Sequence, residues 1–353
     1  MDSPTRFVRS RDATRIAYKV AGEGPALVQL NAPKYSQVEL FPQRPGMLPY
    51  LQHLGRGRTL ITMDFRGTGM SERDVSDHSP EAITDDLEAV LDDLGITATD
   101  IVTNGPRETP AIRLAVRQPE RVRRIVLGSP SAPRPVSPGH PGEPGMLELM
   151  ESNWEAFLEM SVQMITGQLA SELDDYVAFV RRCIDQKNFI AEIIASRQEE
   201  DWQLAALVKH PVLVMDPGFV VGLVPSGRIQ AFAEQFPHGR FITHPAEHWK
   251  PPYSHATWLI QAIEEFFGPV PVANEALLPI NAATLTPRER EVLSLLAAGL
   301  TQPEVAAELC ISPATVSRHV VSVYSKIGAH RRAEAVAWAI HHGLDVPVAR
   351  PAR

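Results

Sequence analysis

Cysteine is scarce in this chain of 353 residues, where Cys183 and Cys310 are the only two. They lie far apart in different predicted helical regions, which excludes a disulfide framework and fits a reducing environment. Long apolar runs are also missing, because no segment approaches the roughly 18–20 apolar residues that span a bilayer. The first residues, MDSPTRFVRSRD, hold no apolar segment of the secretory kind. The sequence therefore predicts a cytoplasmic protein with no membrane partner.

An excess of positive charge is absent too, since the formal net charge is −8. The charge is divided unevenly along the chain. Residues 281–353 carry eight basic and six acidic residues, a net charge of +2, while residues 1–280 hold the other 26 basic and 36 acidic residues, a net charge of −10. An acidic body with a mildly basic tail suits a sensor joined to a nucleic-acid-binding module. The basic excess is too small to identify DNA as the partner by itself.

Short β-branched runs alternate with helical patterns over residues 1–268, which predicts an α/β fold with a mostly parallel, eight-stranded sheet. Helical patterns at Pro80–Leu94 and Pro110–Arg117 lie between strands. The interval from Pro133 to Lys209 holds no strand pattern, and we interpret it as an inserted helical lid. The predicted strands are Arg6–Arg9, Arg15–Val20, Ala26–Leu30, Leu60–Asp64, Ile101–Asn104, Arg124–Leu127, Val212–Asp216 and Arg240–Thr243.

The residues after Phe267, GPVPVANEALLPINAAT, contain three prolines and have no clear period, which indicates a linker. We therefore predict an α/β domain over residues 1–268 and a linker over 269–283. A small all-helical domain is expected over 284–345, followed by a tail over 346–353.

Three helix starts follow one another closely in the C-terminal region. Thr286-Pro287-Arg288-Glu289 combines a capping-box Thr and Glu with Pro at the first helical position, and Thr301-Gln302-Pro303-Glu304 is a similar start. Ser312-Pro313-Ala314-Thr315 is the third. The predicted helices Thr301–Leu309 and Ser312–Ile327 are separated by two residues only, which is the tight join of a helix-turn-helix.

The third of these helices has two different faces. Its apolar residues recur at i, i+4, i+7 and i+11 and form one stripe: Val316, Val320, Val323 and Ile327. The opposite face carries Arg318, Val321, Ser322 and Ser325.

The exposed face has the residue types that read DNA. Arg318, near the N-terminal end of the helix, is placed to reach a guanine edge in the major groove, and Val321 to touch a thymine methyl group. Lys326 and Arg332 lie further along the chain, where they suit phosphate contacts. The alternative is a packing module that no longer binds DNA, but capping and an exposed arginine are hard to explain by packing.

Residues 285–344 resemble the C-terminal domain of LuxR-family regulators over its whole length, including LTPREREVL, Gly299-Leu300-Thr301, ISPATVSRHV and RAEAVAWA. The resemblance implies four helices, DNA bound by a dimer, and dimer contacts from the last helix, Arg331–His342. The family often has lysines at the positions of Ser317 and Val321, so we expect Arg318 to carry more of the base readout here. The expected DNA contacts are Thr301, Thr315, Ser317, Arg318, Val321, Ser322, Lys326 and Arg332.

The N-terminal region resembles the α/β-hydrolases. The run from Asp64 to Ser71, DFRGTGMS, follows a predicted strand and matches the D-x-R-G-x-G-x-S turn of that family. The run from Ala115 to Val122 resembles the end of the helix after the nucleophile. The resemblance covers about Arg6 to Phe267 and implies the fold, but a fold does not imply an activity.

The nucleophile position of that family is empty in this sequence. Counting back from Pro119 places the G-x-S-x-G elbow at Thr103–Arg107. Gly105 then occupies the position of the serine and has no side chain to attack with. Pro106 occupies the position of an oxyanion donor and has no N–H. Arg107 replaces the last glycine of the elbow.

The other catalytic positions are lost as well. Asn31-Ala32 stands where the family usually has the His-Gly of the oxyanion hole, and Val221 stands at the position of the acid. Of the triad, His248 alone remains. We therefore expect no hydrolase activity. Among substitutes, Glu108, Thr109 and Asp216 are interpreted as caps or surface groups.

The lid supplies apolar residues with helical spacings: Met146, Leu147, Leu149, Met150, Trp154, Phe157, Met160 and Met164. They fit either an amphipathic core face or an adaptable apolar surface. A hydrolase scaffold with a lid has a pocket between lid and sheet. We expect that pocket to take a small apolar ligand and no metal or cofactor, with a lining of Asn31, Gly105, Pro106, Trp154, Phe157 and His248.

The leading hypothesis is a dimeric, ligand-responsive transcription regulator. Its expected partners are double-stranded DNA, a second copy of the chain, an apolar ligand and, as a further option, RNA polymerase. Two alternatives stay open: an active ester or lactone hydrolase with a regulatory domain, and a hydrolase-like domain used only for dimerisation or protein interaction.

Overall fold

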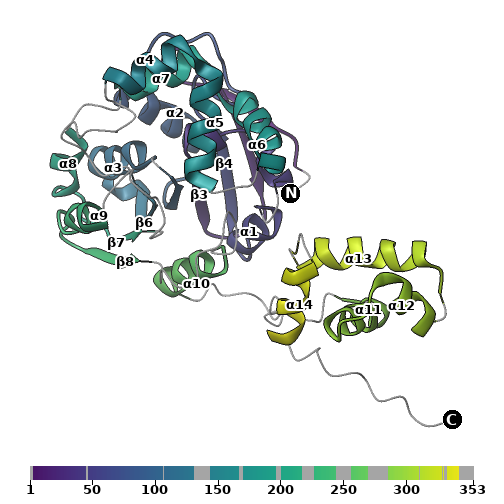
Figure 1. Ribbon diagram of the computed structural model, residues 1–353. Helices are drawn as coiled ribbons and strands as arrows, with labels where there is room; N and C mark the ends of the chain where they lie inside the picture. The colour runs from purple at the N-terminus through teal and green to yellow at the C-terminus, as the bar shows by residue number, and fades with distance from the viewer. Residues whose placement is uncertain are drawn as a thin grey trace. The chain divides into compact units, whose positions relative to one another are not determined.

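The computed structural model describes residues 3–44, 47–105, 107–130, 144–166, 170–195, 200–216, 226–243, 256–268, 285–309, 311–327, 329 and 332–341. The chain divides into two compact units, Met1–Val272 and Ala273–Arg353. We refer to them as the first and the second unit (Figure 1). The division falls within residues 269–283, the segment that the sequence assigns to a linker.

The first unit is built on one eight-stranded sheet with the order β1-β2-β4-β3-β5-β6-β7-β8. β1 and β2 are antiparallel to their neighbours, and all other pairs are parallel. This confirms the mostly parallel sheet predicted from the sequence. The strands are β1 (Arg6–Arg9), β2 (Arg15–Ala21), β3 (Ala26–Asn31), β4 (Thr59–Asp64), β5 (Thr99–Asn104), β6 (Val122–Gly128), β7 (Val212–Asp216) and β8 (Gly239–Thr243).

The inner strands are buried on both faces because helices cover both sides of the sheet. Alternate residues of one strand belong to different cores, as Ile101 and Val102 of β5 do. The helices outside the lid are α1 (Met47–Leu54), α2 (Pro80–Asp93), α3 (Glu108–Arg117), α9 (Ser226–Ala233) and α10 (Ala256–Phe267).

Local signals set the start of α2 but not that of α3. Ser79 caps α2 by accepting a hydrogen bond from the N–H of Ala82 at 3.2 Å, as Ser before Pro80 predicts. α3 begins at Glu108, two residues before the predicted start at Pro110. Proline is tolerated anywhere in a first turn, where the N–H groups have no partner within the helix, so it did not mark the first residue.

The predicted lid is a run of helices between β6 and β7 with no strand among its described residues. Its helices are α4 (Pro144–Ser152), α5 (Trp154–Thr166), α6 (Ala170–Cys183), α7 (Gln186–Ala195) and α8 (Glu200–Ala205). The N–H of Gly69 donates to the carbonyl of Cys183 at 2.7 Å, and Thr68 and Ile184 form a bridge. The lid is therefore joined to the chain that leaves the carboxyl end of β4. Figure 1 shows α4–α7 gathered along one side of the unit.

The second unit consists of α11 (Pro287–Ala297), α12 (Gln302–Glu308), α13 (Pro313–Ile327) and α14 (Arg332–His341). Capping boxes at Thr286/Glu289 and Thr301/Glu304 begin the first two helices, as predicted. The buried residues of this unit form clusters of their own, separate from those of the first unit.

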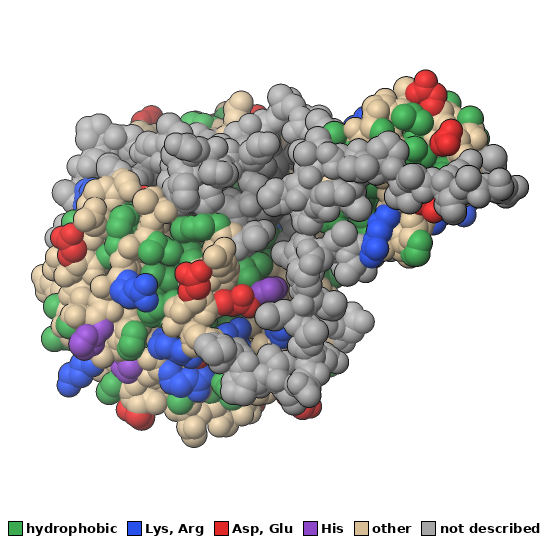
Figure 2. Space-filling model, turned by 90° about the horizontal axis from the view of Figure 1, so that it is seen from below, with side chains coloured by type: hydrophobic (Ala, Val, Ile, Leu, Met, Phe, Trp, Pro, Cys, Tyr) green, Lys and Arg blue, Asp and Glu red, His purple; other side chains and the backbone are tan. Residues whose placement is uncertain are grey.

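The described helices of the chain are all too short or too polar to cross a membrane. On the face of the first unit drawn in Figure 2, basic, acidic and apolar side chains lie side by side. The acidic excess of residues 1–280 is thus not a single acidic patch on that face.

Candidate functional sites: the elbow beneath the lid and the helix-turn-helix

Gly105 lies directly after β5, at the position where the sequence analysis places the nucleophile elbow, and its backbone is left-handed. Its φ is +80°, in the left-handed region, and its N–H donates to the carbonyl of Gly128 at 2.8 Å. A Cβ atom at this position would lie 2.9 Å from the Cβ atom of Ala32. The elbow therefore presents bare backbone at the carboxyl end of β5.

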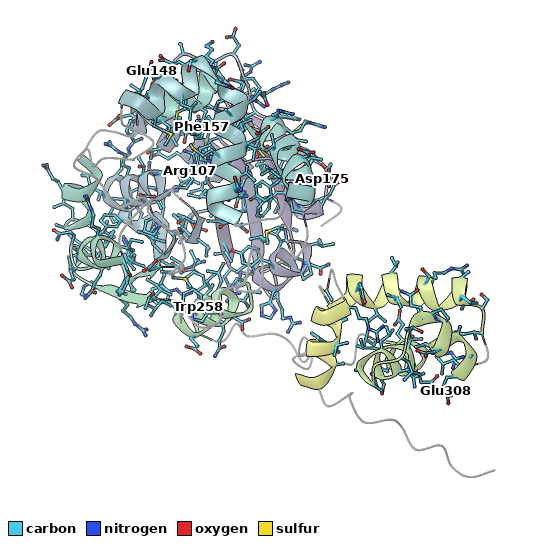
Figure 3. All side chains as sticks on the ribbon, viewed as in Figure 1. Arg107, Glu148, Phe157, Asp175, Trp258 and Glu308 are labelled. Carbon is cyan, nitrogen blue, oxygen red and sulfur yellow. The ribbon has the colours of Figure 1, made fainter. Side chains whose placement is uncertain are left out.

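Arg107 fills the space beside the elbow with a buried guanidinium. Its side chain lies between the β5–α3 turn and the lid, with 5% exposure. It forms two hydrogen bonds with the carboxylate of Glu192 on α7, the longer at 3.2 Å, and Nε donates to the carbonyl of Asn31 at 3.3 Å. The guanidinium also stacks 4.7 Å from the ring centroid of Phe65. Figure 3 labels Arg107 in the interior of the unit.

The sequence predicts no role for the Arg107 side chain, only the loss of a glycine. Its partner Glu192 lies 85 residues further along the chain, so no local pattern pairs the two. The carbonyl of Asn31 faces this guanidinium at the place where the family has its oxyanion hole. The pair therefore places a buried salt bridge beside the carboxyl ends of β3 and β5.

Asp64 holds the segment that follows β3. Its carboxylate accepts hydrogen bonds from the N–H groups of Val38 and Met70, at 3.1 and 2.9 Å, and from the hydroxyl of Ser36 at 3.2 Å. Burial raises the pKa of Asp64 to about 6 despite these donors. Gly69 is required here because a Cβ atom would lie 2.1 Å from a carboxylate oxygen of Asp64. The predicted D-x-R-G-x-G-x-S turn thus supports a loop rather than supplying chemistry.

Three aromatic side chains of the lid form one cluster. Trp154 and Phe157 of α5 stack with centroids 5.4 Å apart, and Phe189 of α7 lies 5.6 and 5.5 Å from them. The ammonium group of Lys34 lies over the rings of Phe157 and Phe189, at 5.1 and 5.2 Å. Burial lowers the pKa of Lys34 to about 8. The sequence analysis did not identify Lys34.

The predicted pocket residues are placed only in part. Asn31 and Gly105 lie at the carboxyl ends of β3 and β5, and Trp154 and Phe157 lie on the lid helix α5. Pro106, Val221 and His248 fall outside the described residues. The lid residues that pack into the core beneath it are Met146, Leu147, Leu149, Met150, Trp154, Phe157 and Met160; the side chain of Met164 is not described.

Two of the residues expected to be caps or surface groups are buried. Glu108 opens α3 with 4% exposure, and Asp216 ends β7 with 4%. Asp216 accepts hydrogen bonds from the hydroxyls of Ser226 and Thr243. The prediction of surface positions was wrong for both. It rested on the polarity of the residue type, and the sequence does not show which helices and loops cover these two positions. Among the described residues, no group of three or more His, Cys, Asp or Glu could hold a metal ion.

Side-chain hydrogen bonds stabilise the helix ends in the helix-turn-helix of the second unit. The hydroxyl of Ser312 accepts the N–H of Thr315 at 3.1 Å at the start of α13, and Arg288 donates to the carbonyl of Leu309 at 2.7 Å at the end of α12. The N–H and hydroxyl of Thr301 both donate to Glu304 at 2.7 Å.

Most of the described side chains of α13 lie on the predicted faces, with Ser322 as the exception. Val316 and Val320 are buried with residues of α11 and α12, and Val323 with residues of α11 and α14, which confirms these three positions of the apolar stripe. The side chain of Ile327 is not described. Ser317 and Arg318 are exposed, and the side chain of Val321 is 67% exposed. A valine so exposed on a helix with an otherwise buried stripe has no packing role in this unit.

Residues 283–339 match the family described as bacterial regulatory proteins, luxR family. The second unit is a LuxR-type helix-turn-helix domain. The chain is 48% identical over 63 residues to the probable transcriptional regulatory protein NarL of Mycobacterium tuberculosis, covering 18% of this chain and 29% of that protein. It is 34% identical over 94 residues to the nitrate/nitrite response regulator protein NarL of Escherichia coli, covering 23% and 44%. The chain thus spans less than half the length of these relatives.

The first unit has the α/β-hydrolase fold. A bromoperoxidase from Bacillus anthracis aligns with 75% of this chain and 99% of its own, with a TM-score of 0.61 and 17% identity. An esterase from Exiguobacterium antarcticum covers 75% and 98%, with a TM-score of 0.60 and 15% identity. A structure described as Est816, an N-acyl homoserine lactone degrading enzyme, covers 74% and 100%, with a TM-score of 0.58 and 17% identity.

Two polar side chains expected to face DNA are bonded inside the LuxR-type domain. The hydroxyl of Ser322 donates to Glu289 of α11 at 2.7 Å. The guanidinium of Arg332 donates to the carbonyls of Leu296 and Leu300, at 3.2 and 2.7 Å. Helical periodicity gives the direction of a side chain but not the neighbour that meets it. The side chain of Lys326 is not described.

Proposed function

We propose that the chain is a DNA-binding transcription regulator that acts as a dimer, and that its first unit is a catalytically inactive sensor of a small ligand. The observation that carries the proposal is the exposed face of α13 in a LuxR-type domain, with Ser317, Arg318 and Val321 turned away from the domain core. The names of the relatives, which are transcriptional regulatory proteins, support it.

Arg318 supplies the base readout in this proposal. A guanidinium in the first turns of a recognition helix forms paired hydrogen bonds with guanine, and each such pair contributes about 1–3 kcal/mol to discrimination. Val321 follows within one turn and offers an apolar contact for a thymine methyl group. A net charge of +2 on residues 281–353 gives little phosphate attraction, so two domains on two half-sites are needed for useful affinity.

Catalytic inactivity rests on the elbow. Gly105 offers no nucleophile, and a transition-state oxyanion beside it would meet the Arg107–Glu192 pair in place of free N–H donors. Loss of one oxyanion donor alone typically costs about 10²–10³ in rate. A ligand beneath the lid that binds one conformation of the chain better than another shifts the population toward that conformation. DNA binding then depends on the ligand.

The test is an electrophoretic mobility shift with DNA from upstream of the chain's own gene. The full chain is expected to shift this DNA, and Arg318→Ala to weaken binding about tenfold or more, from the loss of about 1–3 kcal/mol per guanine contact. Arg240→Ala is the matched control, because it removes another exposed arginine, from the first unit. If the two variants bind alike, or neither they nor the parent chain binds, the DNA-reading role is wrong.

Turnover of p-nitrophenyl esters or of acyl homoserine lactones by the same preparation tests the inactivity. No turnover above buffer is expected. A rate that His248→Ala abolishes would replace the sensor with an active hydrolase joined to a regulatory domain.

A further inference from the structure

Lys34 lies at the place where open α/β folds bind ligands. It belongs to the short 3-10 turn Pro33–Tyr35, directly after β3. Ligands of such folds bind outside the carboxyl ends of the parallel strands, where β3 and β5 end next to each other in this sheet. The hydrogen bonds of Asp64 to Ser36 and Val38 fix the segment that carries Lys34.

Lys34 is half-buried, and its desolvated ammonium group has no anionic partner among the residues that the structure describes. Its neighbours are the faces of Phe157 and Phe189. Desolvation is the cause of its lowered pKa, with no carboxylate acting on it. A buried ammonium is costly unless it is paired, and an aromatic face compensates only in part. A methionine would fill the same space without that cost.

Arg107, a buried cation that contacts the same lid helix, does not share this situation. Arg107 is neutralised by Glu192, which lies one turn from Phe189 on α7. The carboxylate of Glu192 is therefore already paired with Arg107. The ring of Phe189 on the same helix instead meets the ammonium group of Lys34. The described charges of this region leave one positive charge at Lys34.

We propose that Lys34 and the aromatic cluster of Trp154, Phe157 and Phe189 form a binding site for an organic acid. The ammonium binds the carboxylate, and the rings bind an alkyl or aryl body. This inference rests on the sensor role proposed above, and it replaces the small apolar ligand expected from the sequence with an amphipathic anion.

Isothermal titration calorimetry on the full chain tests the proposed acid site. The ligands are hexanoate, decanoate and phenylacetate, and the affinity of each is compared with that of its primary amide. At least one acid is expected to bind saturably below about 1 mM, with its amide about tenfold weaker or more, because the amide lacks the charge that pairs with the ammonium. Lys34→Met is expected to weaken the acid about tenfold and leave the amide unchanged, and Lys34→Arg to keep the preference. Lys187→Met, which removes an exposed lysine from α7, is expected to change nothing.

The pH dependence of the same titration separates an ion pair from apolar packing. Lys34 is charged below about pH 8, so acid binding is expected to hold at pH 6–7.5 and to weaken about tenfold per pH unit above 8. The described carboxylates of the helices packed around it are exposed or already paired: Glu155 and Glu159 on α5, Asp174 and Asp175 on α6, and Glu192 on α7. Burial raises the pKa of the Cys183 thiol on α6, so this thiol stays neutral over the same pH range. Binding that is flat from pH 7 to 9.5 contradicts the ion pair.

The outcomes are distinguishable from those of the DNA test because no DNA is present in the titration. Binding of no acid, or equal binding of acid and amide, overturns the acid site even if the chain shifts DNA. Equal binding by Lys34→Met and the parent also overturns it, provided that the circular dichroism of the variant is unchanged. Acid binding that depends on Lys34 supports the site, and it does so even where the shift of DNA does not respond to that acid.

Discussion

At the scale of single residues, Gly105 is the position on which the proposed inactivity of the first unit rests. Its left-handed backbone is retained, although a side chain there would press on Ala32. A serine at this position in an enzyme carries such strain because the chemistry requires it. Glycine relieves that strain, in keeping with the proposal that the first unit is catalytically inactive.

Gly105→Ser is expected to lower the free energy of unfolding without creating a hydrolase. A non-glycine residue in the left-handed region costs about 1–2 kcal/mol, and the contact with Ala32 adds to this cost. Gly95→Ser is the matched control, because Gly95 has a φ of +62° with no atom within 4 Å of the added Cβ. Urea denaturation measures both variants, and p-nitrophenyl acetate measures activity. An equal loss in the two variants, or esterase activity in Gly105→Ser, contradicts this account.

The sequence predicted the backbone features of the site and missed its charged side chains. Gly105 was found because the strand–turn–helix register is local and can be counted from a motif. Arg107 and Lys34 were missed because their surroundings are made by Glu192, Phe157 and Phe189, which come from the lid. Side-chain pairing over such separations depends on how the lid packs, and residue type alone does not encode it.

At the scale of elements, the salt bridge of Arg107 and Glu192 joins α7 of the lid to the turn between β5 and α3. Both groups are buried, so removal of one leaves the other charged and unpaired in a desolvated place. The loss of one partner of a buried pair typically costs about 3–5 kcal/mol, whereas replacement of both by apolar residues is often neutral.

Arg107→Met is therefore expected to destabilise the first unit by about 3–5 kcal/mol, and the double variant Arg107→Met, Glu192→Met to recover most of that loss. Urea denaturation followed by tryptophan fluorescence measures it. The exposed pair Arg181–Glu155, also on lid helices, serves as the control. Arg181→Met is expected to cost less than about 1 kcal/mol. Additive losses in the double variant of the buried pair would show that the two side chains act independently.

Elements that begin with a strong local signal were predicted better than elements that depend on packing. α11 and α12 begin where their capping boxes place them, and β1 and β7 have the predicted bounds. β5 begins at Thr99, two residues earlier than predicted, because its first residues pair with β6 and the pairing is not visible in the strand's own sequence. The lid was predicted as several helices, but the bounds of the individual helices were not predicted.

At the scale of the whole molecule, the two units keep separate cores and opposite charge balance. The buried clusters of Met1–Val272 contain no residue of the LuxR-type domain, and the clusters of that domain contain none of the first unit. A domain with its own hydrophobic core can unfold on its own. The charge of −10 on residues 1–280 opposes DNA, so the small basic excess of the C-terminal region must work beside an acidic body.

Differential scanning calorimetry of the full chain is expected to resolve two transitions, one for each unit. Gly105→Ser is expected to lower the temperature of the larger transition alone. Glu289→Gln is expected to lower the smaller one alone, by the roughly 0.5–2 kcal/mol of a lost cap, because Glu289 accepts the N–H of Thr286 and the hydroxyl of Ser322. A transition that moves with both variants would mean that the units unfold as one. In that case a ligand bound to the first unit would act on the DNA-binding domain through shared packing. Two separate transitions would mean that the ligand acts by changing how two independently folded units are arranged.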